Sequence, residues 1–111
     1  MAVVGENGVF AWANISQTGT QTKEDSYNVT SITDNGTGRT IFTFSTAAVN
    51  NDYAVMCSSG NRNSTTTSSR AQNLDGELST TSCRIRNFLL SGTSDQNIDD
   101  SLVTITIISD N

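Results

Sequence analysis

The side chains that most often carry catalysis are scarce in this sequence. Its 111 residues include no histidine, which is the commonest general base and a leading metal ligand. A Ser-His-Asp or Cys-His arrangement therefore cannot be assembled from this chain. Glycine motifs that cradle phosphates are missing, and two cysteines without histidine do not complete a tetrahedral zinc site. The sequence predicts a non-enzymatic protein without a metal or a cofactor.

Acidic residues are the remaining candidates for hydrolysis or metal binding. Two adjacent pairs occur, Glu24-Asp25 and Asp99-Asp100, but catalysis by paired carboxylates needs one of them partly buried so that its pKa rises. Both pairs stand in polar, turn-rich sequence, so we expect exposed acids and disfavour a polysaccharide-cleaving enzyme. Oxygen-bearing side chains suited to Ca²⁺ gather late in the chain, at Asp95, Asn97, Asp99 and Asp100. They lack the glycine and the final glutamate of an EF-hand loop, so they predict no specific calcium site.

A long polar segment, Ser58–Glu77, is the strongest candidate for a binding loop. It contains almost no large apolar side chain, and so long a polar stretch inside a compact domain is usually functional or simply solvated. Serine, threonine, asparagine and arginine can hydrogen-bond a sugar or another protein's surface, so both interpretations stay open. The candidate receptor or partner contacts are Arg62, Asn63, Thr65, Thr66, Arg70 and Asn73.

Alternation of apolar and polar side chains predicts strands rather than helices throughout. The most secure element is a hairpin over Ser26–Thr46, because Asn35-Gly36 and Gly38 supply the positive φ angles of a tight turn. A short exposed strand also fits Ser16–Asp25. We expect an all-β domain over residues 9–111 after an N-terminal arm at residues 1–8. Its architecture is a small antiparallel sandwich, jelly-roll-like, or a partly open barrel, of about six to eight strands. The other predicted strands are Val9–Ile15, Tyr53–Ser58, Ser82–Leu90 and Ser101–Ile108.

Large apolar side chains mark the expected core. In strand phase Phe10 and Trp12 share a face, where they pack in the core or between subunits, or else form a ligand platform. Cys57 and Cys83 could meet across neighbouring strands, but a cytosolic origin favours free thiols. The candidates for the core or a subunit interface are Phe10, Trp12, Phe42, Phe44, Tyr53 and Ile105.

Composition narrows the classes of partner. The net charge of −5 leaves no basic patch of the kind that nucleic acids or anionic membranes require. Arg84 and Arg86 share one strand face, which is either solvated and ion-paired or an anion site. No apolar run is long enough for a membrane helix, and the N-terminus lacks the features of a signal peptide, so we expect synthesis and retention in a cytoplasm.

Several segments together resemble one protein family. AWANISQTGT, DSYNVTSITDNGTG, TIFTFSTA and NNDYAVM are similar to the C-terminal region of tail-fibre and related virion proteins of tailed phages, notably those of cyanobacteria and marine bacteria. The match spans Ala11 to about Val55. The resemblance implies a virion protein made in the host cytoplasm, a homotrimer, and contacts with other virion proteins.

Two functions follow from the resemblance. The first is attachment to a host cell-surface glycan or protein through the Ser58–Glu77 loop. The second is a decoration protein that cements the capsid or tail, with residues 1–8 as its anchoring arm. Neither requires nucleic-acid binding or membrane insertion.

Overall fold

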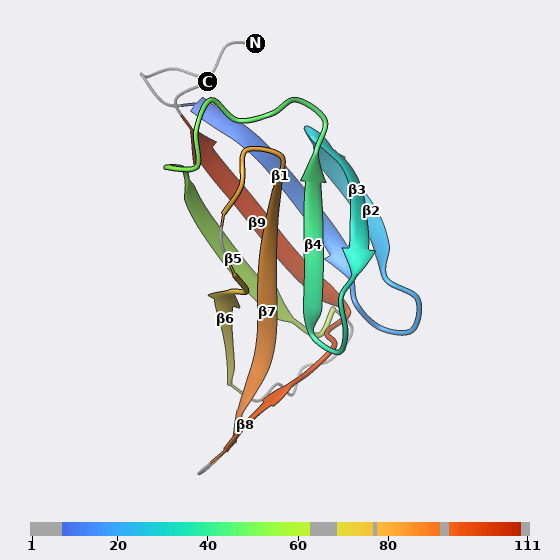
Figure 1. Cartoon of the computed structure of the whole chain (residues 1–111). Coiled ribbons are helices and arrows are strands. Elements are labelled where there is room, and N and C mark those ends of the chain that lie inside the picture. The colour runs from blue at the N-terminus through green and yellow to red at the C-terminus, as the bar shows by residue number, and fades with distance from the viewer. Residues whose placement is uncertain (1–7, 63–68, 77, 92–93, 110–111) are drawn as a thin grey trace.

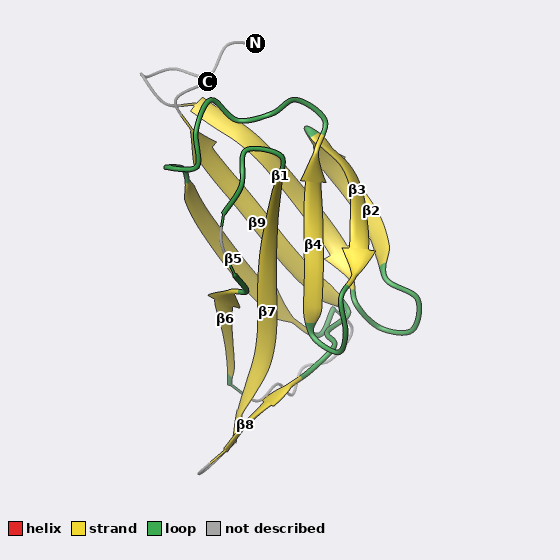
Figure 2. Ribbon diagram, in the orientation of Figure 1, coloured by secondary structure: helices red, strands yellow, loops and turns green. Residues whose placement is uncertain are grey.

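The fold is a β-sandwich. The computed structural model describes residues 8–62, 69–76, 78–91 and 94–109, and this part contains two antiparallel sheets and no helix (Figures 1 and 2). The four-stranded sheet has the order β2-β1-β9-β5, and the five-stranded sheet has the order β3-β4-β7-β6, with β8 paired to β7. The strands are β1 (Gly8–Ser16), β2 (Thr22–Tyr27), β3 (Val29–Asp34), β4 (Arg39–Phe44), β5 (Ala54–Gly60), β6 (Arg70–Leu74), β7 (Ser82–Ser91), β8 (Ser94–Asn97) and β9 (Leu102–Ser109).

This architecture confirms the predicted all-β class. Of the two predicted architectures it is the sandwich, because the two sheets do not close into a barrel. The hairpin at Ser26–Thr46 is confirmed as β3 and β4, and β2 is the short exposed strand. Two strands were missed, because β6 and β8 carry few apolar side chains. Of the predicted arm at residues 1–8, only Gly8 lies within the described residues, and it belongs to β1.

The core fills the space between the two sheets. Alternate residues of β4 and β9 point into it, which gives their strict in-out pattern of burial. The rings of Phe10 and Phe44 meet edge to face at 5.1 Å between centroids, and Phe44 and Tyr53 do so at 5.8 Å. Five of the six predicted core residues are therefore buried: Phe10, Phe42, Phe44, Tyr53 and Ile105.

Trp12 is the exception, because a β-bulge changes the phase of β1. The pairing register with β9 shifts between Val9 and Ala11, so Phe10 turns inward together with Ala11. Trp12 is only half-buried and lies on the opposite, outer side of the sheet. The prediction that Phe10 and Trp12 share a face was wrong, because simple alternation does not allow for an extra residue.

The two cysteines are free and lie in different sheets, Cys57 on β5 and Cys83 on β7. Burial raises the pKa of Cys57 to about 11. Burial, with a smaller contribution from the Cys57 thiol, raises the pKa of Cys83 to about 12. Both thiols are therefore protonated near neutral pH and poorly nucleophilic, as expected for structural cysteines.

Asn28 carries the chain from one sheet to the other. The predicted hairpin begins at Ser26, but Asn28 has a φ of 56° and separates β2 from β3, so the observed hairpin begins at Val29. Its side-chain amide donates to the carbonyls of Phe10 (3.2 Å) and Thr46 (3.4 Å), and its Oδ1 accepts from the Thr46 N–H (2.8 Å). Asparagine suits this corner because it tolerates the left-handed conformation and bonds nearby backbone.

Replacing Asn28 should separate its side-chain and backbone roles. We expect Asn28→Ala to lower the free energy of unfolding by about 2–4 kcal/mol, because it loses the hydrogen bonds and strains a left-handed backbone. Asn28→Gly keeps the backbone conformation accessible, so its loss should be smaller by about 1–2 kcal/mol. Urea unfolding measures both values, provided that the dependence of the unfolding free energy on urea concentration is the same in both variants. Equal losses in the two variants would show that the backbone conformation contributes nothing.

Candidate functional site

The predicted acidic sites are occupied by structural contacts. Among the described residues, no group of three histidine, cysteine, aspartate or glutamate side chains could hold a metal ion. Asn97 accepts a hydrogen bond from Arg86, and Asp99 accepts one from the Gly38 N–H at 2.7 Å. The side chain of Asp95 lies outside the described residues. The described members of this cluster are not arranged as a cation site.

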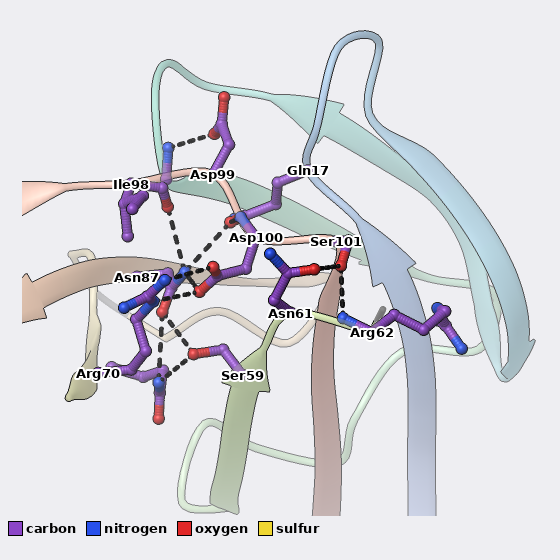
Figure 3. Close-up of polar contacts among 12 residues, drawn as sticks. Gln17, Ser59, Asn61, Arg62, Arg70, Asn87, Ile98, Asp99, Asp100 and Ser101 are labelled. Atoms are coloured by element: carbon purple, nitrogen blue, oxygen red, sulfur yellow. Dashed lines mark hydrogen bonds and ion pairs between the residues drawn. The ribbon is translucent and has the colours of Figure 1, made fainter. Parts of the chain in front are cut away.

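Asp100 is buried, contrary to the expectation of an exposed acid. Only 3% of the residue is exposed, and its carboxylate accepts hydrogen bonds from Arg70 Nε at 2.8 Å and Nη2 at 3.0 Å (Figure 3). Asn87 Nδ2 donates to the same carboxylate at 2.8 Å. The Asp100 hydrogen bond raises the pKa of Arg70. A buried carboxylate held this way by a cation is a structural group, not a general acid.

The hydrogen bonds around Asp100 join the two sheets at one end of the sandwich. Gln17 follows β1, and its side-chain Oε1 accepts a hydrogen bond from the Asp100 backbone N–H. The Gln17 backbone N–H donates to the Asp100 carbonyl at 2.8 Å. Asn87 Oδ1 on β7 accepts from the Ser59 hydroxyl on β5 at 2.7 Å. Gln72 Nε2 on β6 donates to Ser59 Oγ at 2.6 Å. No buried side-chain polar atom in the described part of the chain lacks a partner.

The predicted binding loop is not one continuous loop. Strand β5 extends to Gly60, and β6 pairs with β7 along Arg70–Leu74, so the segment between Ser58 and Glu77 is partly sheet. Arg70 points into the buried network and is unavailable to a receptor. Arg62 and Asn73 are exposed but belong to different parts of the fold. The remaining predicted contacts, Asn63, Thr65 and Thr66, lie outside the described residues.

The outer side of the four-stranded sheet carries a continuous apolar and aromatic surface. Cross-strand partners place Tyr27, Trp12, Thr106 and Met56 in one row over β2, β1, β9 and β5. A second row beside it holds Val9, Ile108 and Ala54. We call this surface the aromatic face; its members are Val9, Trp12, Tyr27, Ala54, Met56, Thr106 and Ile108.

The aromatic face is exposed and almost uncharged. Tyr27 is 57% exposed, Met56 50% and Val9 37%, values that are high for large apolar side chains. The next row along the sheet is polar, with Ser58 Oγ and Thr104 Oγ1 hydrogen-bonded at 2.6 Å. Large exposed apolar patches with a polar rim mark interaction sites on soluble proteins.

A pocket adjoins the aromatic face at the Asn28 corner. Its volume is about 440 Å³, and its lining is uncharged: Val9, Phe10, Tyr27, Asn28, Ser45 and Thr46. Val9 and Tyr27 belong both to this lining and to the aromatic face, so the two form one continuous surface. Hydroxyl groups of Tyr27, Ser45 and Thr46 provide donors and acceptors beside apolar carbon. The arrangement can hold a protruding side chain of a partner, but it contains no nucleophile paired with a base.

Sequence reasoning missed this surface, although a signal for it exists. Trp12, Met56 and Ile108 occupy the outward positions of their strands, where a solvated sheet would carry polar residues. Three apolar residues in the outward phase of neighbouring strands indicate an apolar outer face. The signal becomes readable only when strand order is known.

Comparisons with protein-family models, with curated proteins and with solved structures found no match.

Removing the Asp100 carboxylate should destabilise the whole sandwich. We expect Asp100→Ala to lower the free energy of unfolding by about 3–5 kcal/mol, because Arg70 is left buried without its counter-charge. Asp99→Ala is the matched control with the same change in net charge, and it should cost about 1 kcal/mol for one lost hydrogen bond.

Adding Arg70→Met to Asp100→Ala removes the buried guanidinium that faced Asp100 and should recover part of that loss. Urea unfolding measures all three variants. A similar loss for Asp99→Ala and Asp100→Ala would contradict the structural role of the buried pair.

Proposed function

We propose that this chain is a non-enzymatic bacteriophage virion protein, a module of the tail-fibre type that is displayed on the particle and contributes to host attachment. The resemblance in sequence supports the virion setting. Two of the resembling positions have structural reasons: Asn28 turns the chain between sheets, and Gly38 leaves no room for a side chain. A Cβ at Gly38 would lie 2.4 Å from the Asn87 carbonyl oxygen. The fold explains why these two positions hold Asn and Gly, and the binding role needs separate support.

The aromatic face is the observation that carries the binding role. Tyrosine, tryptophan and methionine are enriched at protein interfaces, and charged residues are depleted at interface centres. The aromatic face has this composition, and the pocket beside it can take an anchoring side chain. In the proposed function this face contacts a host surface protein, and a homotrimer, as the resemblance implies, would present three copies.

A decoration role is the second candidate. An uncharged apolar face of this kind also suits a permanent interface between virion proteins. Permanent interfaces are more hydrophobic than transient ones. In that case the aromatic face would cover a neighbouring capsid or tail subunit and would be buried in the mature particle.

The position of the chain in the virion discriminates between the two roles. We expect a cryo-EM reconstruction of the intact particle to show the sandwich at the distal end of a tail appendage, with the aromatic face accessible. Density at capsomer junctions, with that face covered, would instead establish the decoration role. A particle without density for this chain would contradict both.

Substitutions on the aromatic face should weaken attachment without unfolding the protein. We expect Tyr27→Ala combined with Met56→Ala to weaken binding of the labelled protein to host cells by about 30-fold. The stability should change by less than about 0.5 kcal/mol per site, because both side chains are exposed.

The control is Leu74→Ala, which removes a side chain that is 48% exposed on β6 in the other sheet. Its binding should equal that of the unaltered protein. Equal binding by the Tyr27 and Met56 variant would exclude the aromatic face as the attachment surface.

A further inference from the structure

The outer side of the five-stranded sheet gathers arginines in a chain that is acidic overall. Arg39 on β4 and Arg86 on β7 are directly opposite each other as cross-strand partners. Arg84, two residues from Arg86, pairs with Ile41 in the same register and points to the same side. These three residues, here called the arginine face, are half of the chain's six cationic residues.

Within the described residues, only one carboxylate forms an ion pair with these three arginines. Arg39 Nη1 lies 3.7 Å from Asp75 Oδ2, a loose ion pair that is partly exposed. Arg86 donates from Nε to Asn97 Oδ1 at 2.6 Å, and its guanidinium lies 4.4 Å from the centre of the Phe88 ring. Neither of those partners carries charge. Arg84 is exposed, and no ion pair in the described part of the chain includes it.

The placement of Arg39 opposite Arg86 is electrostatically unfavourable. Like charges directly opposite on neighbouring strands repel each other, as Arg39 and Arg86 do here. Arg39 and Arg84 are not among the buried core residues, whereas Arg86 packs over the buried Phe88 ring. The Asn97 and Phe88 contacts hold Arg86 in one place, which reduces the entropy that it would lose on binding. Guanidinium groups present several donors in a plane and match the geometry of a carboxylate.

We infer that the arginine face binds an acidic polysaccharide, whose carboxylates are spread along a chain of sugars. The charge of the whole protein selects this ligand over a nucleic acid. Duplex DNA carries one negative charge per about 1.7 Å of axis, and a protein of net charge −5 repels so dense a polyanion. A uronate polymer carries at most one charge per sugar, so three arginines can balance the segment that they contact.

The inference does not rest on the proposed function. The arginine face and the aromatic face lie on the outer sides of opposite sheets, and they involve different residues. The acidic polysaccharide could therefore bind while the aromatic face is covered by a protein.

Binding of polygalacturonate to the recombinant full chain tests the inference, with uncharged dextran as the reference polymer. Isothermal titration calorimetry should detect binding of polygalacturonate alone, and the affinity should fall as salt is raised. Arg84→Gln should weaken binding by about tenfold, the effect of losing one charge-assisted contact. Arg62→Gln is the matched control: it makes the same change in net charge at an exposed site outside the arginine face, so it should change affinity less than twofold.

Three results would overturn the inference: no binding of polygalacturonate at low salt, equal weakening by Arg62→Gln and Arg84→Gln, or tighter binding of poly-glutamate or single-stranded DNA. Circular dichroism of each variant establishes that it is folded. Failure of this experiment leaves the host-cell experiment on the aromatic face unaffected, because the two use different variants and different ligands.

Discussion

The buried carboxylate of Asp100 is the constraint on which the arrangement of the two sheets depends. A buried charge must be paired and hydrogen-bonded, because its desolvation otherwise outweighs the gain from packing. The carboxylate accepts hydrogen bonds from Arg70, which opens β6, and from Asn87 in β7, and the Asp100 backbone bonds Gln17, which follows β1. These bonds can form together only when both sheets have reached their final positions. Burial of the apolar core drives folding, and this hydrogen-bond network favours one alignment of the two sheets.

That alignment gives the molecule two outer faces of different chemistry. The four-stranded sheet presents uncharged rings and methyl groups, whereas the five-stranded sheet presents guanidinium groups. The inner sides of both sheets are similar and apolar, so the difference is not required by folding. Both outer faces carry large side chains, such as Tyr27, Met56 and Arg84, that are not part of the core.

Local patterns in the sequence predicted much of the fold and little of the binding surface. Strict alternation located β4 and β9, and the glycines of the turn after β3 located the hairpin. The bulge at Phe10, the corner at Asn28 and the burial of Asp100 depend on partners that are 13 or more residues away, which no local pattern contains. The aromatic face is also non-local. Tyr27 and Trp12 become neighbours because β2 pairs with β1, and Met56 joins them because both β1 and β5 pair with β9. Sequence reasoning thus succeeded where the chain interacts with itself at short range.

The pairing of β1 with β9 determines how this fold would respond to a pulling force. Gly8 and Ser109 are cross-strand partners, so the described chain enters and leaves the sandwich at adjacent points. Antiparallel hydrogen bonds run perpendicular to the strands. Tension applied through these two points would break the hydrogen bonds between β1 and β9 one after another, beginning at the Gly8 end. Tension applied through the outer faces would instead be shared among many contacts at once. The direction of the force would therefore decide how easily the domain unfolds.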